Sequence, residues 1–337
     1  MILPVTVAAA MFAGVLAYAV LGGADFGSGF YDLTAWPREH GRQMHRLIDE
    51  SLGPVWEANH VWLIYVLVMW WTAFPGAFAA AMTTLFLPLA LALAGIVLRG
   101  ASFAFRKYAA TFGLAQLFGA VFAGTSLITP YFLGTVAGEL ASGRVPAQGY
   151  GDPIGSWVNP TSITGGALAV ATCVFLAGVY LTADARRSGL DRLENRLRRL
   201  TLAVGIVVGA TVFGGLYPVL YDAPTLSNGL LGRGLPVLII AAVAGSATIV
   251  LVYLHHYQVA RVTAAAAVGT VVLGWAFGQY PWLLVDESTI DAAAGAHATL
   301  QALLVVVGIA VVVVLPSLGY LLWFTQQGAS TDTAIPD

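Results

Sequence analysis

The sequence predicts an all-α polytopic membrane protein with about nine transmembrane helices. Of its 337 residues, 58 % are apolar and only 9 % are charged, against roughly 25 % charged in an ordinary soluble domain. Nine apolar segments reach the length of about 20 residues that a helix needs to cross a bilayer. The 15 basic residues are gathered in a few short loops, and the net charge of -2 gives no reason to expect a nucleic-acid partner.

The predicted spans follow one another through mostly short connections. Pro75 separates the second and third spans at a tight turn, while Pro88 and Pro218 fall inside spans, where kinks are tolerated if neighbouring helices satisfy the freed carbonyls. No basic residue precedes the first span, so we expect a retained helix and not a cleaved signal peptide. The nine predicted ranges are 4–29, 54–74, 76–98, 111–138, 161–182, 200–221, 234–254, 260–280 and 296–325.

The basic residues predict the orientation, because the side of the membrane with the excess of Lys and Arg is cytoplasmic. Only Arg144 and Arg233 fall on one side of the nine spans. The N-terminus is therefore predicted outside and the C-terminus in the cytoplasm. The 13 basic residues on the cytoplasmic side are Arg38, Arg42, Arg46, Arg99, Arg106, Lys107, Arg186, Arg187, Arg192, Arg196, Arg198, Arg199 and Arg261.

Three connecting or terminal segments have their own composition. The outer loop from Glu139 to Pro160 is rich in Gly and Pro and is expected to be an irregular connection, not a domain. The basic stretch 184–199 forms either an amphipathic helix on the inner surface or the start of the sixth span, since its leucines are spaced for one helical face. Residues 1–325 are therefore predicted to form a single transmembrane domain, and 326–337 a short polar C-terminal tail that we expect to be disordered.

One carboxylate stands out at the start of the second span. The stretch 53–63, GPVWEANHVWL, places Glu57 and His60 between bulky apolar residues. A charged side chain in the bilayer core is disfavoured by roughly 2.5–3.5 kcal/mol on insertion scales, so it normally has an ionic partner, a water-filled cavity or a proton to bind. Packing alone does not explain a carboxylate framed by Trp56 and Trp62, and we therefore predict that Glu57 lies on a proton path.

Other polar residues are predicted to lie at the depth of Glu57. Asp25 and Asp32 fall toward the inner end of the first span, and Arg99 falls at the inner end of the third. His60 is three residues beyond Glu57 and shares its helix face. We therefore expect His60, Asp25 and Arg99 to form a supporting polar cluster beside Glu57, near the cytoplasmic boundary, where it would accept protons from the cytoplasm.

Structural alternatives remain open for these residues. Asp25 and Arg99 alternatively form an ion pair that fixes the register of two helices, because buried ion pairs often specify packing and not chemistry. Glu57 alternatively lies high enough to be solvated by the preceding loop. In either case the residues would have no part in proton transfer.

The histidines give no sign of a heme or metal site. Two adjacent histidines end the seventh span and His297 opens the ninth, so no predicted span carries a central histidine of the kind that ligates heme. Heme ligation by this chain is therefore not expected, with Met69 and Met82 left as alternative ligands, and no metal site is predicted. The single Cys173 excludes an internal disulfide and any all-cysteine metal or iron–sulfur site.

Four stretches together identify a resemblance to subunit II of the cytochrome bd quinol oxidases. The family's GFDFG-like turn appears as GGADFGSG at 22–29, and its WDGNQVW-like motif appears as WEANHVW at 56–62, followed by AFP at 73–75. The arginine–glycine that closes the third span is LRG at 98–100. Near the end, GWAFGQYPWLL at 274–284 and TIDAAA at 289–294 match the last signature. The resemblance covers nearly the whole chain.

The chain departs from the family's pattern around the carboxylate. Glu57 replaces the usual aspartate, Ala58 a glycine and His60 a glutamine, while Ala24 takes the place of a phenylalanine. A glutamate keeps the carboxylate and reaches one methylene further, so a proton role is compatible with the substitution. His60 adds a second titratable group beside it.

The resemblance implies a fold, a set of partners and a location. The fold would be two four-helix bundles plus a peripheral helix in the bacterial cytoplasmic membrane. The chain would be a heme-free subunit that stabilises the heme-bearing subunit I, with hemes b and d, and that conducts cytoplasmic protons through Glu57 to the site of oxygen reduction. Some members also hold a quinone in a lateral groove, and a small accessory subunit and lipids are further expected partners.

Two other functions remain as alternatives. A secondary transporter would use the same buried acids to bind a coupling ion, although such sites favour broken helices at the midplane of the membrane. A purely structural assembly partner would have no proton role at all.

Overall fold

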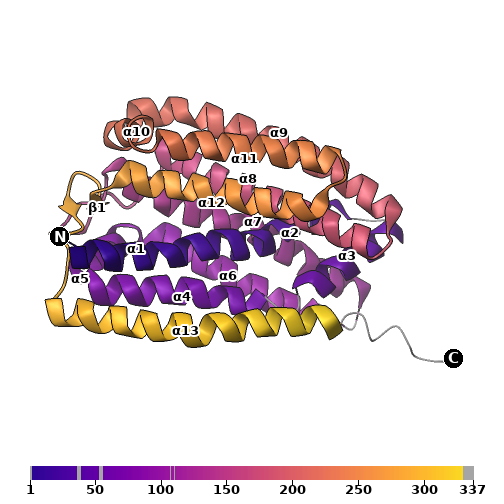
Figure 1. The fold of residues 1–337 in the computed structure, drawn as a ribbon. Coiled ribbons are helices and arrows are strands. Elements are labelled where there is room, and N and C mark those ends of the chain that lie inside the picture. The colour runs from indigo at the N-terminus through magenta and orange to yellow at the C-terminus, as the bar shows by residue number, and fades with distance from the viewer. Residues whose placement is uncertain (1, 36–38, 53–55, 107, 110, 329–337) are drawn as a thin grey trace.

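The computed structural model describes residues 2–35, 39–52, 56–106, 108–109 and 111–328. Its long helices lie side by side in one bundle, with the N-terminus at one end and the last helix running to the other (Figure 1). The helices that carry the spans are α1 (Ile2–Ala17), η1 (Tyr18–Gly22), α2 (Gly23–Thr34), α4 (Trp56–Ala73), α5 (Pro75–Thr84), α6 (Phe86–Arg106), α7 (Phe112–Ser142), α8 (Pro160–Arg187), α9 (Asp191–Asp222), α11 (Leu235–Tyr253), α12 (Tyr257–Gln279) and α13 (His297–Gly328).

Within the described residues, eight helical segments are long and apolar enough to cross a membrane, and a ninth arises if the bent pair α4 and α5 is counted as one span. This confirms an all-helical polytopic membrane protein of about nine spans. The remaining elements are short: α3 (Glu39–Leu52), α10 (Pro224–Leu231) and a two-stranded antiparallel hairpin of β1 (Trp282–Leu284) and β2 (Ser288–Thr289).

The predicted boundary of the third span was wrong. Pro75 opens the separate short helix α5, which is bent by 119° from α4, and the third span is α6, which begins only at Phe86. A second break at Leu85 separates the two helices, and hydropathy alone cannot locate it because both sides are equally apolar. Pro88 consequently lies in the first turn of α6, where a helix does not need the missing N–H.

Three connections at the helix ends are also resolved. The basic stretch 184–199 divides between two helices: its first residues, up to Arg187, end α8, and α9 begins at Asp191 and continues into the sixth span without a break. Residues 143–159, between α7 and α8, form turns and irregular structure, as expected of this connection rich in Gly and Pro. Helix α13 extends to Gly328, so the predicted tail is helical over its first three residues, and 329–337 fall outside the described residues.

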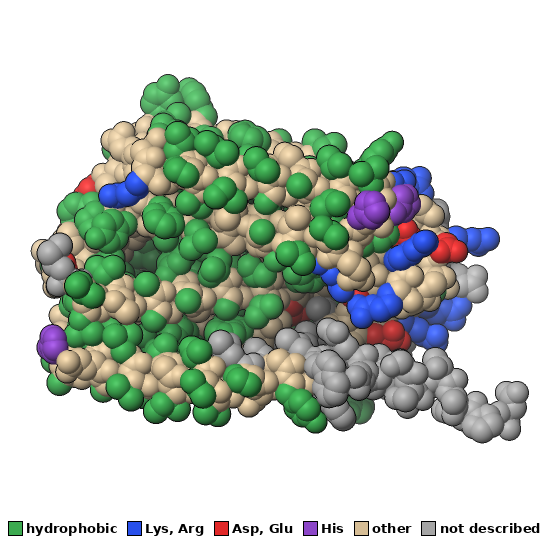
Figure 2. Space-filling model, viewed as in Figure 1, with side chains coloured by type: hydrophobic (Ala, Val, Ile, Leu, Met, Phe, Trp, Pro, Cys, Tyr) green, Lys and Arg blue, Asp and Glu red, His purple; other side chains and the backbone are tan. Residues whose placement is uncertain are grey.

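Helix α3 was not predicted and lies across one end of the bundle. It buries Met44, Leu47 and Ile48 in an apolar cluster with Tyr31 of α2 and Leu181 of α8. The 3–4-residue spacing of these side chains is that of an amphipathic helix. Its opposite face carries charged residues, and Figure 2 shows Lys, Arg, Asp and Glu side chains gathered at this end, which we call the charged end.

Close packing of α2 against α8 depends on a glycine of the 22–29 stretch. A Cβ placed at Gly27 would lie 1.9 Å from the backbone carbonyl oxygen of Cys173 and 2.7 Å from the Val174 nitrogen. Backbone atoms inside a helix cannot move aside as a flexible side chain can, so the two helices must separate to admit a methyl group. Close helix packing therefore accounts for the glycine at position 27, without a chemical role.

We expect Gly27→Ala to destabilise the fold by about 1–3 kcal/mol or more, the cost of overpacking a filled interior. The measurement is the thermal unfolding midpoint of the detergent-purified protein. Gly124→Ala on α7 is the matched control, because nothing lies within 4 Å of a Cβ at that helical position. Equal midpoints for the two variants would contradict the packing account.

Candidate functional site

Asp25 and Arg99 form a fully buried ion pair between α2 and α6. Arg99 Nη2 lies 2.7 Å from Asp25 Oδ1, and Arg99 Nη1 lies 3.3 Å from Asp25 Oδ2, which makes a two-point contact. Their side chains are 2 % and 1 % exposed. The same Arg99 also donates to the Asp25 carbonyl oxygen and, through Nε, to Ser126 of α7. The pair therefore links three helices.

Aromatic rings enclose the guanidinium of Arg99. It lies 4.9 Å from the ring centroids of both Phe26 and Phe122. Cation–π contact of this kind is favourable, most of all where water is excluded. A five-residue π-helix, η1, stands directly before α2, and Asn59 of α4 donates to the carbonyl oxygen of Leu21 within it. Such π turns often mark functional sites.

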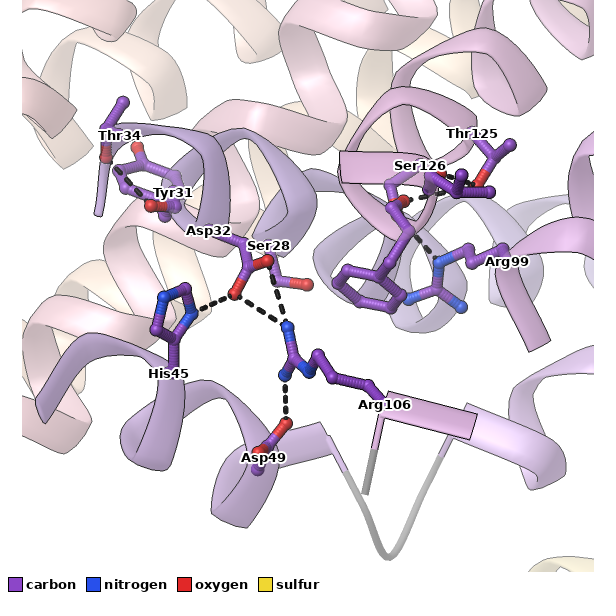
Figure 3. A network of polar contacts seen from close by, with 12 residues as sticks. Ser28, Tyr31, Asp32, Thr34, His45, Asp49, Arg99, Arg106, Thr125 and Ser126 are labelled. Atoms are coloured by element: carbon purple, nitrogen blue, oxygen red, sulfur yellow. Dashed lines mark hydrogen bonds and ion pairs between the residues drawn. The ribbon is translucent and has the colours of Figure 1, made fainter. Parts of the chain in front are cut away.

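A second charged cluster lies at the charged end and joins α2, α3 and α6 (Figure 3). Asp32 is fully buried and accepts from His45 Nδ1 at 2.6 Å and from Arg106 Nη1 at 3.1 Å. Arg106 also donates to Asp49 at 2.6 Å. His45 is 28 % exposed and Asp49 is 34 % exposed, so the cluster leads from a buried carboxylate toward solvent.

Sequence reasoning placed Asp32 at this depth but missed its partners, His45 and Asp49. Both belong to the unpredicted helix α3. The signal that could have found them is the amphipathic pattern of 39–52, whose apolar residues recur at helical spacing between charged ones.

Glu57 lies apart from the Asp25–Arg99 pair. It stands in the first turn of α4, its side chain is exposed, and it has no hydrogen bond or ion pair with another described residue. Exposed apolar side chains continue from it along the same face of α4 at intervals of three and four residues: Val61, Ile64, Val68 and Trp71, each between 50 % and 65 % exposed. We call Glu57 and these four residues the α4 stripe.

His60 turns the other way, into a partly buried aromatic pocket. Its Nδ1 is 3.4 Å from the hydroxyl of Tyr18, and its ring lies about 6 Å from those of Tyr18, Phe26 and Trp56. Phe26 in turn stacks on Arg99. The structure thus brings Asp25 and Arg99 into direct contact, places His60 one aromatic ring away from them, and leaves Glu57 on the surface of the bundle.

His255 and the two candidate methionines have structural surroundings. His255 lies in the turn between α11 and α12, where its Nδ1 is 3.2 Å from the buried Glu194 and 2.8 Å from the Tyr257 hydroxyl. Met69 and Met82 pack in an apolar cluster at the other end of the bundle. Among the residues that the structure describes, no group of three or more His, Cys, Asp or Glu side chains could hold a metal ion.

Comparison with known proteins gives concordant results. The sequence profile of the family described as cytochrome bd terminal oxidase subunit II matches residues 3–325. Two curated proteins of Bacillus subtilis (strain 168) are similar: cytochrome bd ubiquinol oxidase subunit 2, 26 % identical over 200 residues or 57 % of this chain, and putative cytochrome bd menaquinol oxidase subunit II, 30 % identical over 95 residues or 28 % of this chain. The alignments cover 55 % and 27 % of those proteins, so the chain spans about half their length or less.

A solved structure has the same fold. The chain resembles one in the bd oxidase from Geobacillus thermodenitrificans with a TM-score of 0.75, and the match covers 96 % of this chain and 98 % of the other at 23 % sequence identity. Because the identity is only 23 %, this similarity shows a shared fold and nothing more.

Proposed function

The chain belongs to the cytochrome bd terminal oxidase subunit II family, and on that premise we propose that it is the heme-free second subunit of a quinol:oxygen oxidoreductase in the bacterial cytoplasmic membrane. The observation that carries the proposal is the family match over residues 3–325, which overlaps every described helix. The two curated relatives are named as ubiquinol and menaquinol oxidase subunits, so a quinol is the substrate proposed for the complex.

The proposed partner is the heme-bearing subunit I, with hemes b and d, and the α4 stripe is the proposed contact. An isolated carboxylate at the head of an apolar stripe is costly against lipid, since a charge in the bilayer core is disfavoured by roughly 2.5–3.5 kcal/mol on insertion scales. A partner that covers the stripe would supply Glu57 with a polar neighbour or a water-filled space. The stripe would also give this chain the large apolar contact by which it stabilises subunit I.

In this proposal Glu57 passes cytoplasmic protons toward the site of oxygen reduction. It lies in the first turn of α4, near the charged end, and its side chain makes no hydrogen bond or ion pair with a described residue. The Asp25–Arg99 pair and His60 support the site by position: Asp25 and Arg99 fix α2 against α6, and His60 packs between Phe26 and Trp56. These three residues are proposed as supporting residues, not as proton carriers.

The family membership favours the oxidase over a secondary transporter. A transporter site is expected near the midplane, at broken helices whose ends face the ion. Here the acids of the candidate site lie toward the charged end, and the sharp break of the chain, between α4 and α5, is lined by apolar residues such as Phe74 and Ala77. No acid faces that break among the described residues of α4 and α5, whose one acidic side chain is Glu57, at the far end of α4.

The test is to purify the tagged chain from native membranes in a mild detergent and to record a reduced-minus-oxidised spectrum. We expect heme bands and a second large membrane subunit to co-purify with the chain. A colourless chain that purifies alone, in a detergent known to preserve complexes of this kind, would contradict the proposal and favour the transporter.

A further inference from the structure

A buried acid lies at the end of the bundle opposite the charged end, far from the site described above. Glu139 belongs to the last turn of α7 and its side chain is fully buried. Its Oε2 accepts from Asn159 Nδ2 at 3.1 Å and from Ser162 Oγ at 3.2 Å, and both donors are neutral. Its Oε1 is buried without a hydrogen-bond partner among the described residues.

A second acid nearby, Asp222 at the end of α9, has the partners that stabilise an ionised carboxylate. Arg144 contacts both of its oxygens, at 2.5 Å and 3.1 Å, and Thr161 donates to it through the backbone N–H at 3.0 Å and the hydroxyl at 2.5 Å. The neighbouring carboxylate raises the pKa of Arg144 in return. The two acids thus contact adjacent residues of α8, Asp222 at Thr161 and Glu139 at Ser162. Of the two, only Asp222 forms an ion pair with a described residue.

The helix termini around Glu139 do not favour its negative charge. The N-terminus of α8 would stabilise an anion, but its free N–H groups are already bonded: Thr161 donates to Asp222, and Ser162 donates to the capping side chain of Asn159. Pro160, the first residue of α8, has no N–H. Glu139 itself lies at the C-terminal, electronegative end of α7, where a carboxylate is disfavoured.

We propose that Glu139 is a proton-binding site, in which a neutral carboxylic acid exchanges its proton with water through the loop that covers it. A buried, unpaired carboxylate is too costly to persist, and it takes up a proton instead. When two acids have environments this different, their protonation states separate. Glu139 holds the proton, and Asp222 is the anion that pairs with Arg144.

The loop 152–159 offers the route to solvent. Ser156 in this loop is 2 % exposed, and its hydroxyl is also without a partner among the described residues. Asn159 joins the two residues, because its Nδ2 donates to Oε2 of Glu139 and to the backbone carbonyl oxygen of Ser156. A buried water that bonds to the unpaired Oε1 of Glu139 and to the Ser156 hydroxyl would satisfy both. The carboxyl passes its proton to that water and receives one back, so the acid ends neutral.

The charges around Glu139 are few and lie on the loops and on α9. The facing portions of α8, α10 and β1 carry no charged side chain among the described residues, and the charged groups of α2 and α6 lie toward the charged end. Near the covering loop, hydrogen bonds from the Ile154 and Gly155 N–H groups lower the pKa of Asp152, which therefore stays an anion. The charged side chains and the histidine at this end are Arg144, Asp152, Asp222, Arg233, Asp286, Glu287, Asp291 and His297.

Infrared spectra of the intact complex test the proposal. The wild type minus Glu139→Gln difference should contain the C=O stretch of a protonated carboxyl, and that band should shift to lower frequency after transfer to D₂O. Absence of the band would show that Glu139 is ionised. A band that never shifts in D₂O would show a sealed group that exchanges no proton. Either result would overturn the proposal.

Matched variants separate this role from simple packing. Glutamine resembles a protonated glutamate in shape, so Glu139→Gln should leave the yield and the unfolding midpoint of the complex unchanged, whereas Asp222→Asn should lower both by removing the partner of Arg144. Glu139→Asp is the second infrared probe, since it keeps a carboxyl and should move the band without abolishing it. Loss of folded protein in Glu139→Gln alone would count against a neutral Glu139.

Discussion

Arg99→Met is expected to abolish accumulation of the folded chain. It leaves Asp25, 1 % exposed, without the cation that makes a two-point contact with it. Removal of one member of a buried ion pair typically costs about 3–5 kcal/mol, because the other charge stays buried and unpaired. That is a large part of the roughly 5–15 kcal/mol by which proteins are stable. The measurement is the amount of monodisperse protein in mild-detergent size-exclusion chromatography, together with its unfolding midpoint.

The double variant Asp25→Asn, Arg99→Met is the control for this prediction. Because both charges are then removed, the protein should regain a large share of the yield lost in Arg99→Met. If the single and double variants accumulate equally poorly, the loss comes from packing around Phe26 and Phe122 and not from an unpaired charge.

Glu57→Gln is expected to lower quinol oxidase turnover of the assembled complex about tenfold or more. Removal of a group that transfers protons typically costs a factor of roughly 10²–10⁴ where that transfer limits the rate, and less where another step does. The heme spectrum and the amount of co-purifying partner should stay unchanged, because glutamine keeps the size and polarity of the side chain and Glu57 makes no hydrogen bond or ion pair with a described residue of its own chain. Steady-state oxygen consumption per heme is the quantity to compare.

Two further variants sharpen the interpretation. Glu57→Asp restores the residue usual in the family and should keep most of the turnover. Asp191→Asn removes a carboxylate at the start of α9 whose side chain is 78 % exposed, and it should have no effect. Full turnover in Glu57→Gln would leave the chain as a structural partner without a proton role.

The spans were predictable because bilayer thickness and hydropathy determine them. Length and apolar composition identified about nine helices, and the basic residues gather at one end of the bundle as the loop counts predicted (Figure 2). The break at Leu85 was not predictable in this way. It depends on how α5 packs against α4 and α6, and the residues on both sides of it are apolar.

The polar site was predicted in part. The depth of Asp25 and Arg99 followed from their places in the spans, and the two residues are indeed in contact. The exposed position of the Glu57 side chain could not be predicted from the sequence. Helix α4 is apolar around most of its circumference, so its sequence does not indicate which face packs against the other helices. The amphipathic pattern of 39–52 indicates a helix there, but the contacts of that helix with Asp32, and those of the 143–159 loop with Glu139, depend on tertiary packing.

The measurement that tests the central claim most directly is sided proton uptake by the complex reconstituted into vesicles, with wild type and Glu57→Gln compared at equal heme content. Our account predicts that wild-type turnover takes up protons from the side of the charged end, and that this uptake slows in Glu57→Gln in proportion to oxygen consumption. Uptake at the wild-type rate in Glu57→Gln would contradict a proton path through this residue.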